Sequence, residues 1–278
     1  MSSITRYASL FSAALLFVVL SSTTGQASKI TVDAAIRGYA NGFFIDTGDS
    51  WSEQGSPLAV PEVSISDSVS ANGYTFEYLA SSNMQEGSLK VLTSAVSNPH
   101  SSGSATSSIM GMPQALAQIE EDLTFTPPDN NPYQVTLSMA INGSISLDPS
   151  TGYYNLMGLL MQEYGGANDQ EYISLTPSNS INELLEVSLT LQGVSTVYIF
   201  ADMESYIYGI AGDGKQSIAD LSHTAQLAIS MPSGVSMASD SGIFLTAAVP
   251  EPGTLPLMLS GLAGLGLLGR RRRHGKGA

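Results

Sequence analysis

The stretch VTLSMAI, residues 135–141, alternates apolar and small residues and ends at the turn dipeptide Asn142-Gly143. Successive side chains of a β-strand point to opposite faces, so this spacing gives one apolar face and one polar face. The same alternation recurs in residues 185–191 and 225–231, each followed by a turn that contains Gly or Pro. A period of two, closed by turn residues, predicts antiparallel β-strands.

Shorter apolar and aromatic runs extend this pattern along the chain. They lie at residues 74–78, 89–96, 196–201 and 206–210. Turn residues separate them, and no repeat of 20–50 residues is found. The sequence therefore predicts a mainly β domain, folded as an antiparallel sandwich or jelly-roll.

One segment departs from the period of two. Apolar residues recur around Pro113 at helical spacing: Met112, Leu116, Ile119 and Leu123. Proline is favoured in the first turn of a helix, whereas acidic residues 120–122 near the end oppose the helix dipole. We expect one short helix over residues 113–123. Two polar segments, 98–108 and 237–241, are predicted to be flexible.

The N-terminus has the composition of a secretory signal peptide. Arg6 precedes an apolar region from Ala8 to Leu20, and small residues at Gly25 and Ala27 suit a cleavage site. The prediction is removal of residues 1–27 by cleavage after Ala27. An uncleaved N-terminal anchor is the alternative.

The C-terminus combines a short motif, an apolar segment and a basic cluster. Pro250-Glu251-Pro252 precedes the apolar residues 255–268, and Arg270, Arg271, Arg272 and Arg273 follow. Arginines cross a bilayer only at a high free-energy cost, so the cluster stays on the cytoplasmic side and the preceding chain lies outside. This order of features predicts a sorting tail rather than part of a folded core.

The tail resembles the PEP-CTERM sorting signal of Gram-negative bacteria. The resemblance implies that Pro250, Glu251 and Pro252 are the box recognised by exosortase, an integral-membrane transpeptidase. It also implies that residues 255–268 form an apolar sorting helix and that Arg270–Arg273 stop transfer. An ordinary anchor that is never processed is the alternative, but the segment is shorter than the roughly 20 residues a spanning helix needs. Transient anchoring by the apolar segment, followed by processing, is therefore expected.

The chain is thereby divided into a signal peptide at 1–27, a β-sandwich-like extracellular domain at 28–248 and a sorting signal at 249–278. Residues 221–245 also resemble the closing segment of many PEP-CTERM ectodomains. That resemblance implies the last two strands of a sandwich, and it carries no activity.

The extracellular domain is strongly acidic and has no cysteine. It keeps four basic residues, Lys29, Arg37, Lys90 and Lys215, against 23 acidic ones, a net charge of −19. Nucleic acids and anionic membranes bind basic surfaces, so they are excluded as partners. The missing thiols exclude cysteine nucleophiles and thiolate metal sites.

Candidate catalytic residues are few. His100 lies in a serine-rich segment and His223 at a strand start, where a hydrogen bond to a turn is expected. Carboxylate pairs of the kind that glycosidases use are Glu183/Glu186, Glu120/Glu121 and Asp202/Glu204. Because no nucleophile or metalloprotease motif is present, we expect no enzymatic activity.

No cofactor is predicted, with calcium as the alternative. Hard oxygen ligands occur at Asp46–Asp49, Asp129–Asn131 and Asp148–Ser150, none of which matches an EF-hand loop. The single tryptophan, Trp51, is expected in the core. A sugar-stacking surface with the tyrosines is the alternative interpretation.

Three classes of function fit these features. The favoured one is a structural or adhesive component of the cell surface or of an exopolysaccharide or biofilm matrix. The alternatives are a carbohydrate-binding module and a secreted glycoside hydrolase. The expected partners are the export machinery, an exosortase-like transpeptidase and exopolysaccharide.

Overall fold

The computed structural model describes residues 28–40, 43–54, 60–71, 74–97, 110–149, 151–208 and 214–245. All regular secondary structure in these ranges is β-strand, and no helix is found there. The strands are β1 (Lys29–Ala40), β2 (Phe43–Gln54), β3 (Glu62–Ala71), β4 (Tyr74–Asn83), β5 (Ser88–Ser97), β6 (Met110–Thr126), β7 (Tyr133–Ser146), β8 (Gly152–Glu163), β9 (Asn168–Ser174), β10 (Ser178–Leu191), β11 (Ser195–Tyr208), β12 (Gln216–Ser230) and β13 (Ser236–Ser239).

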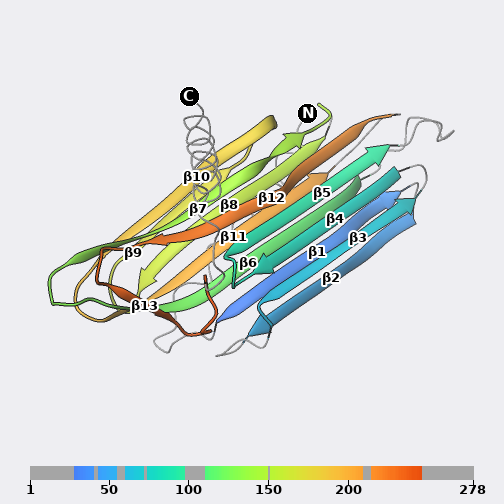
Figure 1. Cartoon of the computed structure of the whole chain (residues 1–278). Coiled ribbons are helices and arrows are strands. Elements are labelled where there is room, and N and C mark those ends of the chain that lie inside the picture. The colour runs from blue at the N-terminus through green and yellow to red at the C-terminus, as the bar shows by residue number, and fades with distance from the viewer. Residues whose placement is uncertain are drawn as a thin grey trace, which may run out of the picture. The chain divides into compact units, whose positions relative to one another are not determined.

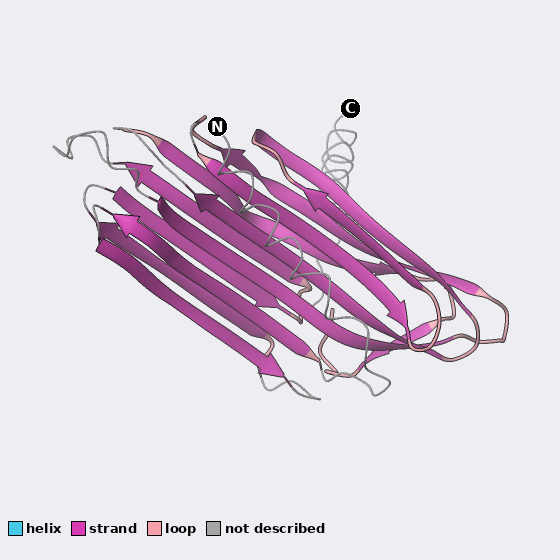
Figure 2. Ribbon diagram, turned by 180° about the vertical axis from the view of Figure 1, so that it is seen from behind, coloured by secondary structure: helices cyan, strands magenta, loops and turns pink. Residues whose placement is uncertain are grey.

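The strands form two antiparallel sheets (Figure 1). Sheet A has the order β2-β1-β6-β11-β8-β9, with β13 paired to β6, and sheet B has the order β10-β7-β12-β5-β4-β3. The two sheets pack face to face, and their strands run in nearly the same direction when seen from either side (Figure 2). This arrangement confirms the predicted antiparallel sandwich.

Alternating side chains of the two sheets meet to form the core. In β7 the apolar residues 135, 137, 139 and 141 are fully buried, as their spacing predicts. Ile119 and Phe125 of β6 and Ile199 of β11 face them from sheet A and are also fully buried. The opposite face of β7 is polar, where the Thr136 and Ser188 hydroxyls lie 2.7 Å apart across neighbouring strands.

The helix expected over residues 113–123 is wrong, because this segment is the long central strand β6. Its inward face consists of odd-numbered residues, including the small Ala115 and Ala117 and the carboxylate Glu121. Because small and charged residues occupy part of this inward face, the alternation of large apolar and polar residues is not visible in the sequence. Leu116, which supported the helical spacing, lies on the opposite face of the strand, where it is only half-buried.

The C-terminal part of the domain also differs from its expectation. The segment 237–241, predicted to be flexible, contributes to β13, which pairs with β6 through Met237 and Phe125. The runs at 196–201 and 206–210 were expected as separate strands, but residues 195–208 form the single strand β11.

The β9–β10 edge of the sandwich is closed by side chains. Glu171 accepts a hydrogen bond of 2.7 Å from the backbone N–H of Glu186, and Asp169 accepts one of 2.8 Å from that of Ser188. These bonds satisfy backbone donors that an edge strand otherwise leaves unpaired. They also tie sheet A to sheet B.

Several sequence expectations lie outside the described residues. They are the cleavage site at Ala27, the segment 98–108 with His100, the box Pro250, Glu251 and Pro252, the apolar segment 255–268 and the cluster Arg270, Arg271, Arg272 and Arg273. Among the residues that the structure describes, no helix is long and apolar enough to cross a membrane.

Candidate functional site

The edge formed by β2 and β3 is open and carries the tryptophan. Trp51 of β2 pairs in register with the fully buried Val32, so its side chain leaves the strand on the inner side of sheet A. Because β2 is the last strand of its sheet, no further strand covers the indole, which is 41% exposed. Asp49, two residues earlier on the same face, has an exposed side chain.

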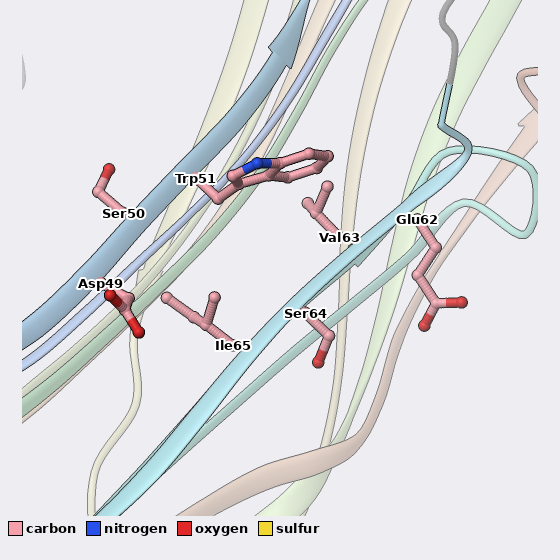
Figure 3. A pocket seen from close by; sticks show the side chains of 7 residues that line it. All are labelled: Asp49, Ser50, Trp51, Glu62, Val63, Ser64 and Ile65. Atoms are coloured by element: carbon pink, nitrogen blue, oxygen red, sulfur yellow. The ribbon is translucent and has the colours of Figure 1, made fainter.

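The opposite wall of this edge comes from β3. Val63 is buried, Ile65 is half-buried, and Glu62 and Ser64 add polar atoms beside them. Together with residues 49–51 they line a groove of about 420 Å³. Figure 3 shows the indole of Trp51 reaching toward Val63, whereas Asp49 lies beside Ile65. We call this feature the Trp51 groove.

The surroundings of the groove are acidic. Tyr78 of β4 is buried next to the in-register Asp67 of β3. Burial raises the pKa of the Tyr78 hydroxyl, and the Asp67 and Asp49 carboxylates raise it further. The phenol therefore stays neutral, and the residues lining the groove include no lysine or arginine.

This combination of groups suits a sugar ring. A partly exposed indole offers an apolar face for stacking, and Val63 and Ile65 provide an apolar floor. The carboxylate of Asp49 is a hydrogen-bond partner for sugar hydroxyls, whereas Ser64 points to the other face of β3 (Figure 3). An apolar groove with a few convergent polar groups is the usual form of a small-molecule site.

The expectation that Trp51 belongs to the core is wrong. Its position in the alternation of β2 matches that of a core residue, since it lies on the inner side of the strand. The sequence cannot show that β2 is an edge strand. The structure shows that β2 lies at the end of sheet A and pairs with β1 on one side, which leaves the indole uncovered.

His223 lies on the surface in an irregular part of β12. The register of β12 shifts between Leu221 and Ala225, and the imidazole Nε2 is 3.6 Å from a carboxylate oxygen of Asp220. The hydroxyl and the N–H of Ser222 both donate to the other oxygen of Asp220. His223 lies inside β12 rather than at the start of a strand, so that expectation is wrong, and its contact is with the Asp220 carboxylate.

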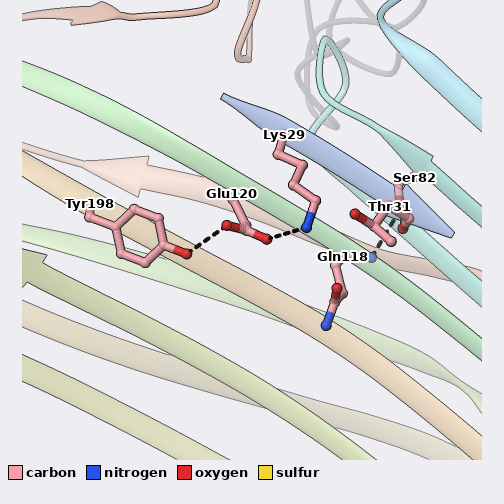
Figure 4. Close-up of polar contacts among 6 residues, drawn as sticks. All are labelled: Lys29, Thr31, Ser82, Gln118, Glu120 and Tyr198. Carbon is pink, nitrogen blue, oxygen red and sulfur yellow. Dashed lines mark hydrogen bonds and ion pairs between the residues drawn. The ribbon is translucent and has the colours of Figure 1, made fainter. Parts of the chain in front are cut away.

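The pair Glu120/Glu121 does not converge, because adjacent strand residues point to opposite faces. Figure 4 shows Glu120 between Lys29, 3.3 Å away, and the Tyr198 hydroxyl, which donates at 2.9 Å. Glu121 instead lies inside the sandwich, where it accepts hydrogen bonds from Ser28 and from the backbone of Ser241. Burial raises the pKa of Glu121.

Of the other two nominated pairs, one is separated by the strand geometry and one is brought together. Glu183 and Glu186 are three positions apart on β10, so they face opposite sides, and both are exposed. Asp202 and Glu204, two positions apart on β11, share the outer face of sheet A. Only this last nominated pair is brought together.

In the structure two of the three candidate calcium segments make hydrogen bonds or an ion pair, and the third is part of a strand. Asp129 accepts hydrogen bonds from the backbone and the side chain of Asn131, which closes a turn. Asp148 forms an ion pair of 2.8 Å with Lys215. Residues 46–49 belong to strand β2 rather than to a loop. Across the described part of the chain, no group of three or more metal-binding side chains is found.

The fold is that of an antiparallel β-sandwich protein, and the C-terminal tail adds a sorting motif. Residues 248–273 match the family model of the PEP-CTERM protein-sorting motif. The chain therefore carries a PEP-CTERM sorting signal, as its residues predict, and this signal supports export with transient membrane anchoring of the C-terminal segment. No curated protein sequence matches the chain.

Two solved structures show a distant similarity. One is TmCBM61 in complex with β-1,4-galactotriose, at 9% identity and a TM-score of 0.22, covering 62% of this chain and 89% of that chain. The other is isomalto-dextranase of Arthrobacter globiformis T6 complexed with panose, at 10% identity and a TM-score of 0.20, covering 76% and 33%. At these values neither similarity bears on function.

Proposed function

We propose that this protein is displayed at the cell surface or in the extracellular matrix, where it binds exopolysaccharide through the Trp51 groove without turning it over. The observation that carries this proposal is the half-exposed indole beside the Asp49 carboxylate at an open sheet edge.

The sorting signal supports the export on which display depends. Exosortase-type machinery is its implied processing partner. In this proposal the Pro250–Pro252 box is recognised while residues 255–268 hold the chain in the inner membrane. Processing then releases the domain to the surface. The acidic domain remains soluble and does not adhere to anionic membrane surfaces.

The test of binding uses the protein released from the surface of producing cells on a glycan array that includes the producer's own exopolysaccharide. We expect Trp51→Ala to lower retention at least tenfold, because stacking of a sugar on the indole is lost. Tyr208→Ala is the matched control, since Tyr208 is a similarly exposed aromatic residue, 38%, outside the groove. Equal retention of the wild type and Trp51→Ala would refute glycan binding at this edge.

The test of display follows the same protein through the cell. Intact mass of the surface fraction should lack residues 1–27 and everything after the Pro250–Pro252 region. Glu251→Ala should leave the protein in the inner membrane. Recovery of a chain that still ends at Ala278 in the outer fraction would contradict processing.

Absence of turnover is tested with the producer's own exopolysaccharide. We expect no release of soluble product after prolonged incubation. Product release that is abolished by Asp202→Asn or Glu204→Gln would place the protein among the glycoside hydrolases, because these two carboxylates share one face.

A further inference from the structure

A second group of residues lies on the outer face of sheet A, away from the Trp51 groove. Its centre is Asp202 of β11, which sits in register between Gly158 of β8 and Gln118 of β6. Asp202 is fully buried, although it points to the outside of the sandwich. Neither oxygen of its carboxylate has a hydrogen-bond partner in another described residue.

The cover over Asp202 is the ring of Tyr172. Tyr172 of β9 pairs with Gly158, and a side chain at Gly158 would collide with both the Asp202 carboxylate and the Tyr172 ring. The absent side chain of Gly158 thus makes the space that the carboxylate and the ring share. Tyr172 is 42% exposed and belongs to an edge strand, so its ring can rotate away without displacing core residues.

The remaining walls are aromatic and acidic. Glu204 lies two positions beyond Asp202 on the same face, and Tyr206 forms a hydrogen bond with it. The rings of Tyr154 and Tyr206 are 6.0 Å apart in an edge-to-face arrangement. Burial raises the pKa of Tyr154, and the carboxylates of Glu204 and Asp202 on the same face of sheet A raise it further.

The charge of this cluster has no counterpart within it. Burial raises the pKa of Asp202 to about 7, and the Glu204 carboxylate adds to the shift. The facing groups are Glu204 on the same strand, Tyr172 of β9, Tyr154 of β8 and the neutral Gln118 of β6.

Two described lysines are engaged elsewhere, since Lys29 pairs with Glu120 and Lys215 with Asp148. A buried carboxylate without a partner destabilises the fold, and a cationic ligand would remove that cost.

We propose that Asp202, Glu204, Tyr154, Tyr172 and Tyr206 form a binding site for an organic ammonium group. The carboxylates supply the charge, and the faces of tyrosine rings attract cations. A neutral sugar would leave the carboxylates uncompensated. A divalent metal ion requires more oxygen ligands than two carboxylates, and tyrosine ring faces do not replace its water. This inference goes beyond the proposed function and does not depend on the Trp51 groove.

Two sources carry this chemistry, the primary amine of a deacetylated amino-sugar polymer and a quaternary amine such as choline. Calorimetric titration of the exported protein at pH 8 with glucosamine oligomers, their N-acetylated forms and choline distinguishes them. We expect binding of at least one ammonium ligand and none of the N-acetylated oligomers. Asp202→Asn and Tyr172→Ala should each weaken binding at least tenfold, and Glu183→Gln, an exposed carboxylate on sheet B, is the matched control.

The pH dependence gives an independent readout with choline, whose charge does not titrate. Affinity should fall about tenfold between pH 8 and pH 6, because Asp202 is then mostly protonated. In Asp202→Asn the residual affinity should change less with pH than in the wild type, because of the two carboxylates only Glu204, whose pKa is also raised by burial, still titrates.

Trp51→Ala should bind ammonium ligands like the wild type, so failure of the glycan proposal leaves this result standing. Absence of ammonium binding, equal binding of N-acetylated oligomers or unchanged binding by Asp202→Asn would overturn the proposal. Calcium binding that Asp202→Asn abolishes would replace it with a metal site.

Discussion

The two edges of this sandwich are built in opposite ways. At the β9–β10 edge, Asp169 and Glu171 each accept a hydrogen bond from the backbone of the other sheet. At the β2–β3 edge, Asp49 and Trp51 face a groove between the sheets. Carboxylates occur at both edges, and among the described side chains those of Asp169 and Glu171 on β9 join the sheets. A carboxylate with backbone partners is structural, whereas one that faces a groove remains available to a ligand.

Strand β9 shows the same division within seven residues. Its odd-numbered residues Asp169 and Glu171 bind β10, whereas Tyr172 lies on the other face and covers Asp202. Some carboxylates of the domain therefore hold the sandwich closed, whereas that of Asp202 has no hydrogen-bond partner in another described residue. The following predictions test this division.

The largest effect is expected when the closed edge is opened. Combining Asp169→Ala with Glu171→Ala removes two charged acceptors and leaves two backbone donors of β10 unpaired. The free energy of unfolding should fall by about 3 kcal/mol, as measured by urea denaturation. The unpaired edge of β10 should also increase aggregation.

Two controls sharpen this comparison. Asp169→Asn with Glu171→Gln keeps the accepting oxygens and should recover most of the lost stability. Asp49→Ala at the open edge should change stability by less than about 0.5 kcal/mol, as is usual for surface substitutions. Equal losses at the two edges would show that β9 and β10 are not joined by these carboxylates.

A smaller effect is expected from the carboxylate without a partner. The pKa of Asp202 in the folded protein, about 7, lies above its ordinary value of 3.8, so the folded state holds the proton more tightly than the unfolded state. The contribution of Asp202 to stability is therefore fully present below its unfolded-state pKa and is lost as the pH rises to about 7. Between pH 5 and pH 8 the wild type should lose roughly 2 kcal/mol.

The variant Asp202→Asn separates this contribution from the rest. An amide of the same shape does not ionise, so stability at pH 8 should rise and the pH profile should flatten. Burial also raises the pKa values of Glu121 and Glu204, so part of the slope should persist. A wild type that is more stable at pH 8 than at pH 5 would contradict the assignment of Asp202 as a buried, unpartnered carboxylate.

Most strands of sheet B could be predicted from the sequence, because their alternation is carried by large apolar residues, whereas β3 was not predicted. Residues 135–141 and 185–191 keep the period of two across β7 and β10. Strand β6 was mistaken for a helix because its inner face uses Ala115, Ala117 and Glu121. Small and charged residues do not mark a buried face in a sequence pattern. These residues of β6 are buried because the opposite sheet packs against them.

The two candidate sites could be predicted only in part. The spacing of Asp202 and Glu204 was enough to nominate them as a pair on one face. The burial of Asp202 depends on Gly158 and Tyr172, which belong to β8 and β9 and reach it only through strand pairing. The exposure of Trp51 likewise depends on the order of strands, which no local pattern contains.

The smallest effect on stability is expected at the most conspicuous side chain of the open edge. Trp51→Ala should lower the free energy of unfolding by less than about 1 kcal/mol, because the indole is already 41% exposed and leaves no closed cavity. Phe76→Ala, at a fully buried aromatic residue of strand β4 in sheet B, should cost about 3–5 kcal/mol in the same urea experiment. A loss from Trp51→Ala as large as that from Phe76→Ala would mean that the indole is part of the core and that the β2–β3 edge is closed. A small loss accompanied by weaker glycan retention would show that the indole is placed there for a ligand.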